Sequence, residues 1–173
     1  MQVLIYSGYY PEHKKLYDDI FKLTQSIGGI YPNYRDWYYN TFLEDLKRGN
    51  RSYAIATHHT IIAGCCLMKH TSDEKKICTL FVHPEYRRQG VGTDLMRVAL
   101  EELGPNSFLT VSMGRLSSFI PFLDRFGFQM KMLPKVKTCD PQEALFYRPK
   151  VRLIQKSRLP VPRKSSQQAY IHA

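Results

Sequence analysis

The chain has 173 residues, a length that is most simply one domain with a substantial buried core. Hydrophobic residues make up 43% of it, as in a folded globule, and no apolar run approaches the roughly 20 residues that cross a bilayer. The start of the chain has neither the basic leader nor the cleavage site of a signal peptide. These features exclude a membrane protein, and we expect a cytoplasmic one.

The formal net charge of +10 is concentrated near the C-terminus. No acidic residue follows Glu143, whereas residues 149–173 contain six lysines and arginines together with prolines, serines and glutamines. This composition is typical of a flexible extension. We therefore expect a folded domain over residues 1–148 and a basic tail over residues 149–173. The tail could bind RNA or another polyanion, or it could be solvated without a partner.

The first part of the chain predicts a strand over residues 2–7 and then two helices. Gly28 and Gly29 end the first helix, and the second runs from after Asn33 to Gly49. The face of the first helix consists of Leu16, Ile20, Leu23 and Ile27. The face of the second consists of Tyr39, Phe42, Leu43 and Leu46. Both spacings predict amphipathic helices that pack on a sheet.

Three strands follow. Residues 51–57 and 61–69 predict a hairpin, and the polar turn at residues 71–74 leads into an apolar strand over residues 77–82. This strand ends at His83-Pro84, because proline removes the next backbone donor. The three strands are therefore consecutive and expected to be neighbours.

A basic loop with two glycines comes next. It contains Arg87, Arg88, Gly90 and Gly92, and it opens a helix. The face of that helix consists of Val91, Leu95, Val98, Ala99 and Leu103. The first turn of a helix has unpaired N–H groups and the positive end of the helix dipole, and glycine lets an anion approach the backbone closely. The unit of strand, cationic loop and helix start therefore predicts a phosphate-binding site.

The remaining domain predicts a strand over residues 107–112, a short helix and two last strands over residues 128–133 and 143–147. Ser117 or Ser118 is the expected N-cap of the short helix. Pro121 would then lie in its first turn, where proline is tolerated.

The motif Arg87-x-x-Gly90-x-Gly92, after Leu80-Phe81-Val82-His83-Pro84 and before the helix with Leu95 and Met96, resembles the acyl-CoA-binding signature of the GNAT superfamily of N-acetyltransferases. The expected order of elements is also that of the GNAT fold. The resemblance implies an α/β protein with a mixed central sheet of about seven strands and four helices, splayed between the fourth and fifth strands.

The resemblance further implies acetyl-CoA as co-substrate. The main chain of Phe81 and Val82 would hold the pantetheine arm, and the amides of the glycine loop would hold the pyrophosphate. The expected cofactor-binding residues are Phe81, Val82, Arg87, Arg88, Gln89, Gly90, Val91, Gly92 and Thr93. The reaction implied is direct attack of a primary amine on the thioester, and the acceptor is a small molecule or a protein.

Two positions depart from the family. Leu123 stands where many members have a tyrosine that protonates the thiolate, and Lys76 stands nearest to a frequent glutamate base. Tyr147 and Cys78 are the remaining candidates for proton transfer, with a structural role for each as the favoured alternative. The general acid and base are therefore not assigned by the sequence.

Aromatic residues are dense between the first two helices, where the fold would place the acceptor. Tyr31, Tyr34 and Trp37 are candidates for binding an amine, with packing onto the sheet as the alternative. Cys65 and Cys66 are expected to be buried on opposite faces of one strand. We expect no metal site, since no spacing of ligands supports one.

The leading function is an acetyl-CoA-dependent N-acetyltransferase. One alternative is an enzyme of the same family that acetylates aminoacyl-tRNA and uses the basic tail to bind RNA. Another is an acyl-CoA-binding sensor without catalysis, which the leucine at position 123 favours. A homodimer is also left open.

Overall fold

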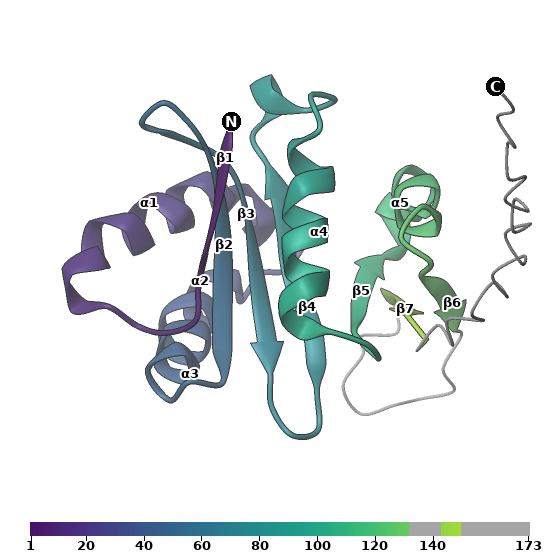
Figure 1. Ribbon diagram of the computed structural model, residues 1–173, viewed down its shortest axis with the longest axis horizontal. Coiled ribbons are helices and arrows are strands. Elements are labelled where there is room, and N and C mark those ends of the chain that lie inside the picture. The colour runs from purple at the N-terminus through teal and green to yellow at the C-terminus, as the bar shows by residue number, and fades with distance from the viewer. Residues whose placement is uncertain (132–142, 150–173) are drawn as a thin grey trace, which may run out of the picture.

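The computed structural model describes residues 1–131 and 143–149, and Figure 1 shows how their elements are arranged. The strands form one seven-stranded sheet in the order β1-β2-β3-β4-β5-β7-β6. Their bounds are β1 Gln2–Tyr6, β2 Arg51–His58, β3 Ile61–His70, β4 Lys75–Val82, β5 Phe108–Ser112, β6 Gln129–Lys131 and β7 Glu143–Tyr147. All pairs are antiparallel except β4 with β5, which are parallel.

Helices cover both faces of the sheet. The α-helices are α1 Lys14–Thr24, α2 Tyr34–Asp36, α3 Leu43–Lys47, α4 Val91–Leu103 and α5 Leu116–Asp124. The short 3₁₀ segments are η1 Pro11–His13, η2 Gln25–Gly29, η4 Pro84–Tyr86 and η5 Met113–Arg115, and η3 Trp37–Phe42 is a π-helix. None of the helices in the described ranges is long and apolar enough to span a membrane.

Two apolar clusters form the core, one on each face of the sheet. The helices α4 and α5 pack on one face, with Leu95, Met96 and Leu123 among the buried residues. The helices α1 to α3 pack on the other, where Tyr38 and Phe42 are buried. The adjacent Cys65 and Cys66 are both buried and belong to different clusters, as their alternation along β3 requires.

The strands β4 and β5 separate after a short contact. Only Lys76 with Phe108 and Ile77 with Leu109 are paired. The next residue of β4, Cys78, is an extra residue in the β3–β4 ladder, where the register shifts between Leu67 and Met68. Because a bulge of this kind bends its strand, β4 turns away from β5 at Cys78. The expected fold class, including the splay between the fourth and fifth strands, is confirmed.

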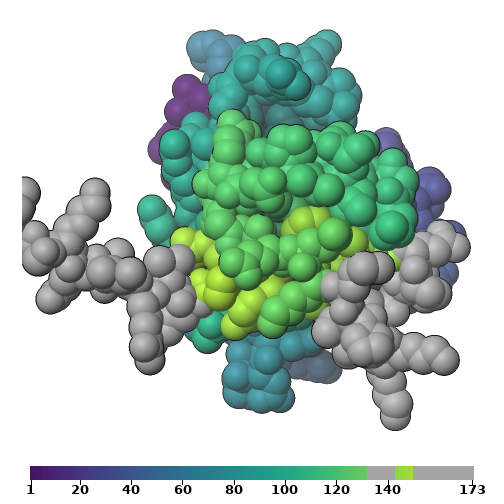
Figure 2. Space-filling model, turned by 90° about the vertical axis from the view of Figure 1, so that its right-hand side faces the viewer, coloured from purple at the N-terminus to yellow at the C-terminus, as the bar shows by residue number. Residues whose placement is uncertain are grey.

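Beyond the separation, β5, β6, β7 and α5 make up one end of the molecule. Figure 2 looks at this end, where the green atoms of α5 lie above the yellow-green atoms of β7. Residues 150–173, which include most of the expected tail, lie outside the described residues. So do residues 132 and 133 at the end of the expected strand 128–133.

The second helix differs from its prediction. Its buried residues are Tyr34, Tyr38, Phe42 and Leu46, whereas Tyr39 and Leu43 are only partly buried. Three successive spacings of four residues drift around a regular α-helix of 3.6 residues per turn. The π-helical segment η3 has wider turns, and it keeps these four side chains on one face.

The start of α5 also corrects the prediction. Its N-cap is Arg115, no side chain caps it, and the Ser118 hydroxyl donates to the Arg115 carbonyl at 2.8 Å. Pro121 is the sixth residue of the helix and not part of its first turn. The proline removes the bond to the Ser117 carbonyl, and Ser117 is exposed, so that water can replace the missing donor.

Gly64 on β3 allows β4 to approach closely. A Cβ atom at this position would lie 2.7 Å from the Phe81 carbonyl oxygen and 3.1 Å from Leu95 Cδ1. We expect Gly64→Ala to lower the free energy of unfolding by about 1–3 kcal/mol, because the backbone of β4 must shift. Urea unfolding measures the change. Gly28→Ala is the control, since its Cβ would meet no atom within 4 Å, and equal stability of the two variants would contradict the prediction.

Candidate functional site

The N-terminus of α4 is open and follows an unusual backbone turn. Gly90, the N-cap residue, has a φ of 89°, which favours glycine, and Arg88 has a φ of 63°. No side chain caps the helix. The amides of Thr93 and Asp94 both donate to the Gly90 carbonyl, at 2.8 and 3.0 Å. The amides before them belong to the first turn of the helix, where N–H groups have no partner within the helix and an anion is favoured.

The loop before α4 is held by its own side chains. The Arg87 Nε atom donates to the Val82 carbonyl at 3.1 Å, and the Gln89 amide donates to the Glu85 carbonyl at 2.7 Å. Arg87, Arg88 and Gln89 are exposed. The structure therefore brings the expected loop residues together at the end of β4, with two guanidinium groups at the surface beside an uncapped helix.

A cavity of about 660 Å³ lies where β4 and β5 diverge. Its walls come from β4 at Ile77–Leu80, from β5 at Leu109–Ser112 and from α5 through Phe119 and Leu123. The segment between α1 and η3 forms the other side. Of the site residues expected from the sequence, Tyr31, Tyr34, Trp37 and Cys78 line this cavity.

Tyr147 lies elsewhere. It pairs with Phe108, at the end of β5 that still contacts β4. Its hydroxyl donates to the Asn106 side chain at 2.8 Å, and Lys131 lies over its ring. Tyr147 is not among the residues that line the cavity. The structure therefore does not bring the two sequence candidates for proton transfer, Tyr147 and Cys78, together.

The three aromatic candidates differ in their surroundings. Tyr34 is buried, and its hydroxyl donates to Thr24 Oγ1 at 2.9 Å. Burial raises the pKa of this phenol far above its usual range, so it stays protonated. Trp37 stacks on Tyr34 with ring centroids 5.6 Å apart. The Tyr31 hydroxyl donates to the Glu143 carboxylate.

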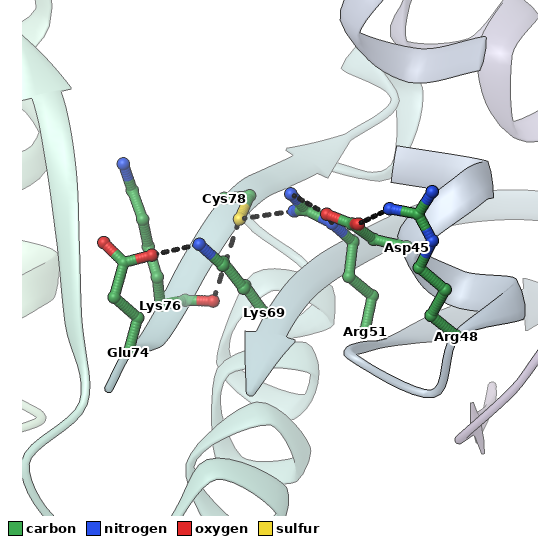
Figure 3. Close-up of polar contacts among 7 residues, drawn as sticks. All are labelled: Asp45, Arg48, Arg51, Lys69, Glu74, Lys76 and Cys78. Carbon is green, nitrogen blue, oxygen red and sulfur yellow. Dashed lines mark hydrogen bonds and ion pairs between the residues drawn. The ribbon is translucent and has the colours of Figure 1, made fainter. Parts of the chain in front are cut away.

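A charged network, drawn in Figure 3, borders the cavity at the start of β2 and β4 and at the end of β3. Arg51, only 4% exposed, donates from Nε and Nη2 to Asp45 Oδ2 at 3.2 and 3.1 Å. Its Nη1 atom lies 3.4 Å from the Cys78 sulfur. Lys69 pairs with Glu74. Removing either member of the Asp45–Arg51 pair would leave a charge in a poorly solvated place.

The Cys78 thiol belongs to this network. Burial raises its pKa above the ordinary value for a thiol, although the charges of Arg51 and Lys76 and the hydrogen bond from Arg51 act in the opposite direction. A thiol with a raised pKa is protonated at neutral pH. Cys78 can therefore accept and donate weak hydrogen bonds, but it is a poor base and a poor nucleophile.

The sequence predicts no role for Arg51, Lys69, Glu74 and Glu143, all of which line the cavity. The structure pairs Arg51 with Lys69, and paired residues share one face of a sheet. This register includes a bulge between Ala56 and Thr57, which the expected hairpin over residues 51–57 and 61–69 does not indicate. No local pattern links Glu143 to Tyr31, which is 112 residues away along the chain. In the described ranges, no group of three or more His, Cys, Asp or Glu side chains could hold a metal ion.

Comparison with known families agrees with this geometry. Residues 49–130, which include β2 to β4, the glycine loop, α4 and α5, match the family model for an acetyltransferase (GNAT) domain. The resemblance to the GNAT superfamily is thereby confirmed over these residues. No curated protein sequence matches the chain.

Solved structures of acetyltransferases share the fold. A protein of the GNAT family from Desulfovibrio desulfuricans is 17% identical with a TM-score of 0.65, over 84% of this chain and 96% of that one. The PaiA N-acetyltransferase from Thermoplasma acidophilum, solved in complex with coenzyme A, is 15% identical with a TM-score of 0.60, over 86% and 99%. A GNAT acetyltransferase from Bacillus cereus is 18% identical with a TM-score of 0.60, over 88% and 100%.

The raised pKa of Cys78 gives a test of the site. Because the thiolate is the form that reacts, alkylation of Cys78 by iodoacetamide should be slower in the folded protein than in urea between pH 7 and 9. The pH at the midpoint of the rise in alkylation rate of Cys78 should lie above the corresponding pH for the unfolded chain. Peptide mass spectrometry follows each cysteine separately. Equal rates for Cys78 in the folded and unfolded protein would contradict the assigned direction of the shift.

Proposed function

We propose that this protein transfers the acetyl group of acetyl-CoA to a primary amine by direct attack. The observation that carries the proposal is the separation of β4 and β5 after two residue pairs, beside the uncapped start of α4. Unpaired strand edges can bind an extended chain through main-chain hydrogen bonds. A helix N-terminus can bind the phosphates to which such a chain is attached.

The residues around the gap fit acetyl-CoA. The glycine loop from Arg88 to Thr93 would hold the pyrophosphate, since Gly90 adopts a backbone conformation that exposes the first amides of α4. The main chain of Phe81 and Val82 would hold the pantetheine arm. Arg87 would act on this arm indirectly, by fixing the Val82 carbonyl. The solved coenzyme A complex of the Thermoplasma protein supports this assignment by its shared fold.

The acceptor would enter from the side of α1 to α3. Tyr31 and Trp37 line the cavity there and offer aromatic surface for an amine, whereas Tyr34 mainly supports Trp37 by stacking. Leu80 and Leu123 make the opposite wall apolar. The thioester would therefore lie between a dry wall and a polar entrance, as an acyl transfer requires.

In the proposed reaction, the amine nitrogen forms a bond to the acetyl carbonyl carbon, and the carbon–sulfur bond breaks. The amine must lose a proton, and the departing thiolate must gain one. We assign the first role to the Glu143 carboxylate, directly or through a water molecule. It lines the cavity, and its partner is the Tyr31 hydroxyl, whereas the other lining carboxylate, Glu74, is paired with Lys69. Cys78, protonated at neutral pH, would be a donor near the sulfur.

The role of Glu143 can be measured with one substitution. Glu143→Gln keeps the size of the side chain and removes its ability to accept a proton, so kcat should fall by about 100-fold or more. The KM for acetyl-CoA should change little. Release of the coenzyme A thiol, followed with a chromogenic disulfide, gives both constants. The matched control is Glu101→Gln on the exposed side of α4, and an unchanged kcat in Glu143→Gln would remove the assignment.

The cofactor site can be tested without turnover. Gly90→Val places a β-branched residue at a φ of 89°, so it should distort the loop and weaken coenzyme A binding by at least tenfold. Isothermal titration calorimetry with coenzyme A measures the affinity. Gly8→Val, whose Cβ would meet no atom within 4 Å, is the control for a glycine far from the loop. Full affinity in Gly90→Val would overturn the assignment of the loop.

The alternatives predict other results in the same assays. An acyl-CoA-binding sensor would bind coenzyme A but release no thiol with any amine. An enzyme that acetylates aminoacyl-tRNA would need RNA binding by residues 149–173, nearly all of which lie outside the described residues. RNA binding, a homodimer and a cytoplasmic location stay predictions from the sequence.

A further inference from the structure

Three basic side chains lie directly opposite one another across the sheet. In the strand register, Arg51 on β2 lies opposite Lys69 on β3, and Lys69 lies opposite Lys76 on β4. Paired residues share a face, and Figure 3 shows the three side chains side by side. We call this set the cationic row. Like charges at opposite positions of neighbouring strands destabilise a sheet, so such a row is unfavourable unless something negative compensates it.

The protein compensates two of the three charges. Asp45 accepts two hydrogen bonds from Arg51, and Glu74 pairs with Lys69. For Lys76, the described residues provide the ring of Phe108, 5.6 Å from the nitrogen, and no carboxylate within ion-pair distance. The three cations and two carboxylates therefore leave one positive charge, at Lys76.

The row is part of the cavity. Arg51, Lys69 and Lys76 all line it, and the Arg51 guanidinium also lies over the Trp37 ring at 5.5 Å. Lys76 is one of the two residues of β4 that are paired with β5. Cys78, where the gap opens, is two residues further along the strand, or about 7 Å in extended backbone. The uncompensated charge of Lys76 therefore lies where β4 and β5 are still paired, two residues before the gap between them begins.

We propose that the acceptor is a small amine that also carries a carboxylate, and that Lys76, supported by the cationic row, binds this carboxylate. The proposal rests on the proposed function and narrows its substrate. A single carboxylate neutralises the single excess charge. With the carboxylate at Lys76, the amine of a short acceptor reaches the level of Cys78, where the pantetheine arm along β4 would present the thioester. A polyamine would be repelled by the same charge.

Matched acceptors provide the first test. The series consists of ω-amino carboxylates of increasing chain length, each compared with its amide, which lacks the negative charge. We expect a higher kcat/KM for the carboxylate of each pair, with an optimum at a length that spans about 7 Å. In Lys76→Met this preference, the ratio of the two kcat/KM values in each pair, should fall by roughly 10- to 100-fold.

The neighbouring lysine gives a matched control. Lys75 is on the same strand, is exposed and does not line the cavity. Lys75→Met therefore removes the same charge from the molecule and should retain the preference for carboxylates. A general electrostatic effect would lower the preference for carboxylates in both variants alike. Lys76→Met should also be at least as thermally stable as the parent, because it relieves the row, and this separates lost binding from lost folding.

The outcomes separate the acceptor class from the reaction itself. If amides or polyamines are acetylated as well as the carboxylates, the reaction stands and the acceptor assignment is wrong. If no amine is acetylated, binding of butyrate to the coenzyme A-saturated protein decides the anion site, measured by calorimetry. Binding that Lys76→Met abolishes and Lys75→Met retains supports the site. No binding, or equal binding by Lys76→Met, overturns it.

Discussion

The loss of pairing between β4 and β5 is the constraint on which the rest of the site depends. The two strands share only two residue pairs, and the bulge at Cys78 then bends β4 away. Everything assigned to function lies along that opening. The glycine loop follows the end of β4, the cavity fills the space between the strands, and the cationic row crosses the sheet where the strands are still joined. One local irregularity in a strand thus accompanies the opening of the cavity on which the proposed site depends.

Most of the fold could be predicted because its elements have strong local signals. Proline at position 84 and the glycines at 90 and 104 mark the ends of β4 and α4, and the alternation of β3 placed Cys65 and Cys66 on opposite faces. The π-helical segment could not be predicted from a pattern of 3.6 residues, because its face is defined by spacings of four residues that depend on packing against β2 and β3. The predicted serine cap of α5 is wrong because the preceding 3₁₀ turn already begins the helical path.

Only the proposed cofactor half of the candidate site has a signal in the sequence. A phosphate-binding loop is contiguous in sequence, so a strand, a basic glycine loop over Arg87 to Thr93 and a helix start together predict it. The acceptor half is assembled from β2, β3, β4, β7 and the segment before α2, and its contacts, such as Tyr31 with Glu143, join distant parts of the chain. The fold also explains why Tyr147 seemed a plausible acid. It is near the end of the last strand in sequence, but its partner on β5 is Phe108, at the joined end of the two strands.

Leu123 has a consequence for water. This side chain is fully buried in the core cluster of α4 and α5, and it also borders the cavity. A tyrosine there would bring a hydroxyl group, and with it a hydrogen-bonded route for solvent, to the wall of the gap. A leucine brings no polar atom to that part of the wall. An acetyl thioester lying against Leu123 would be shielded from hydrolysis on that side.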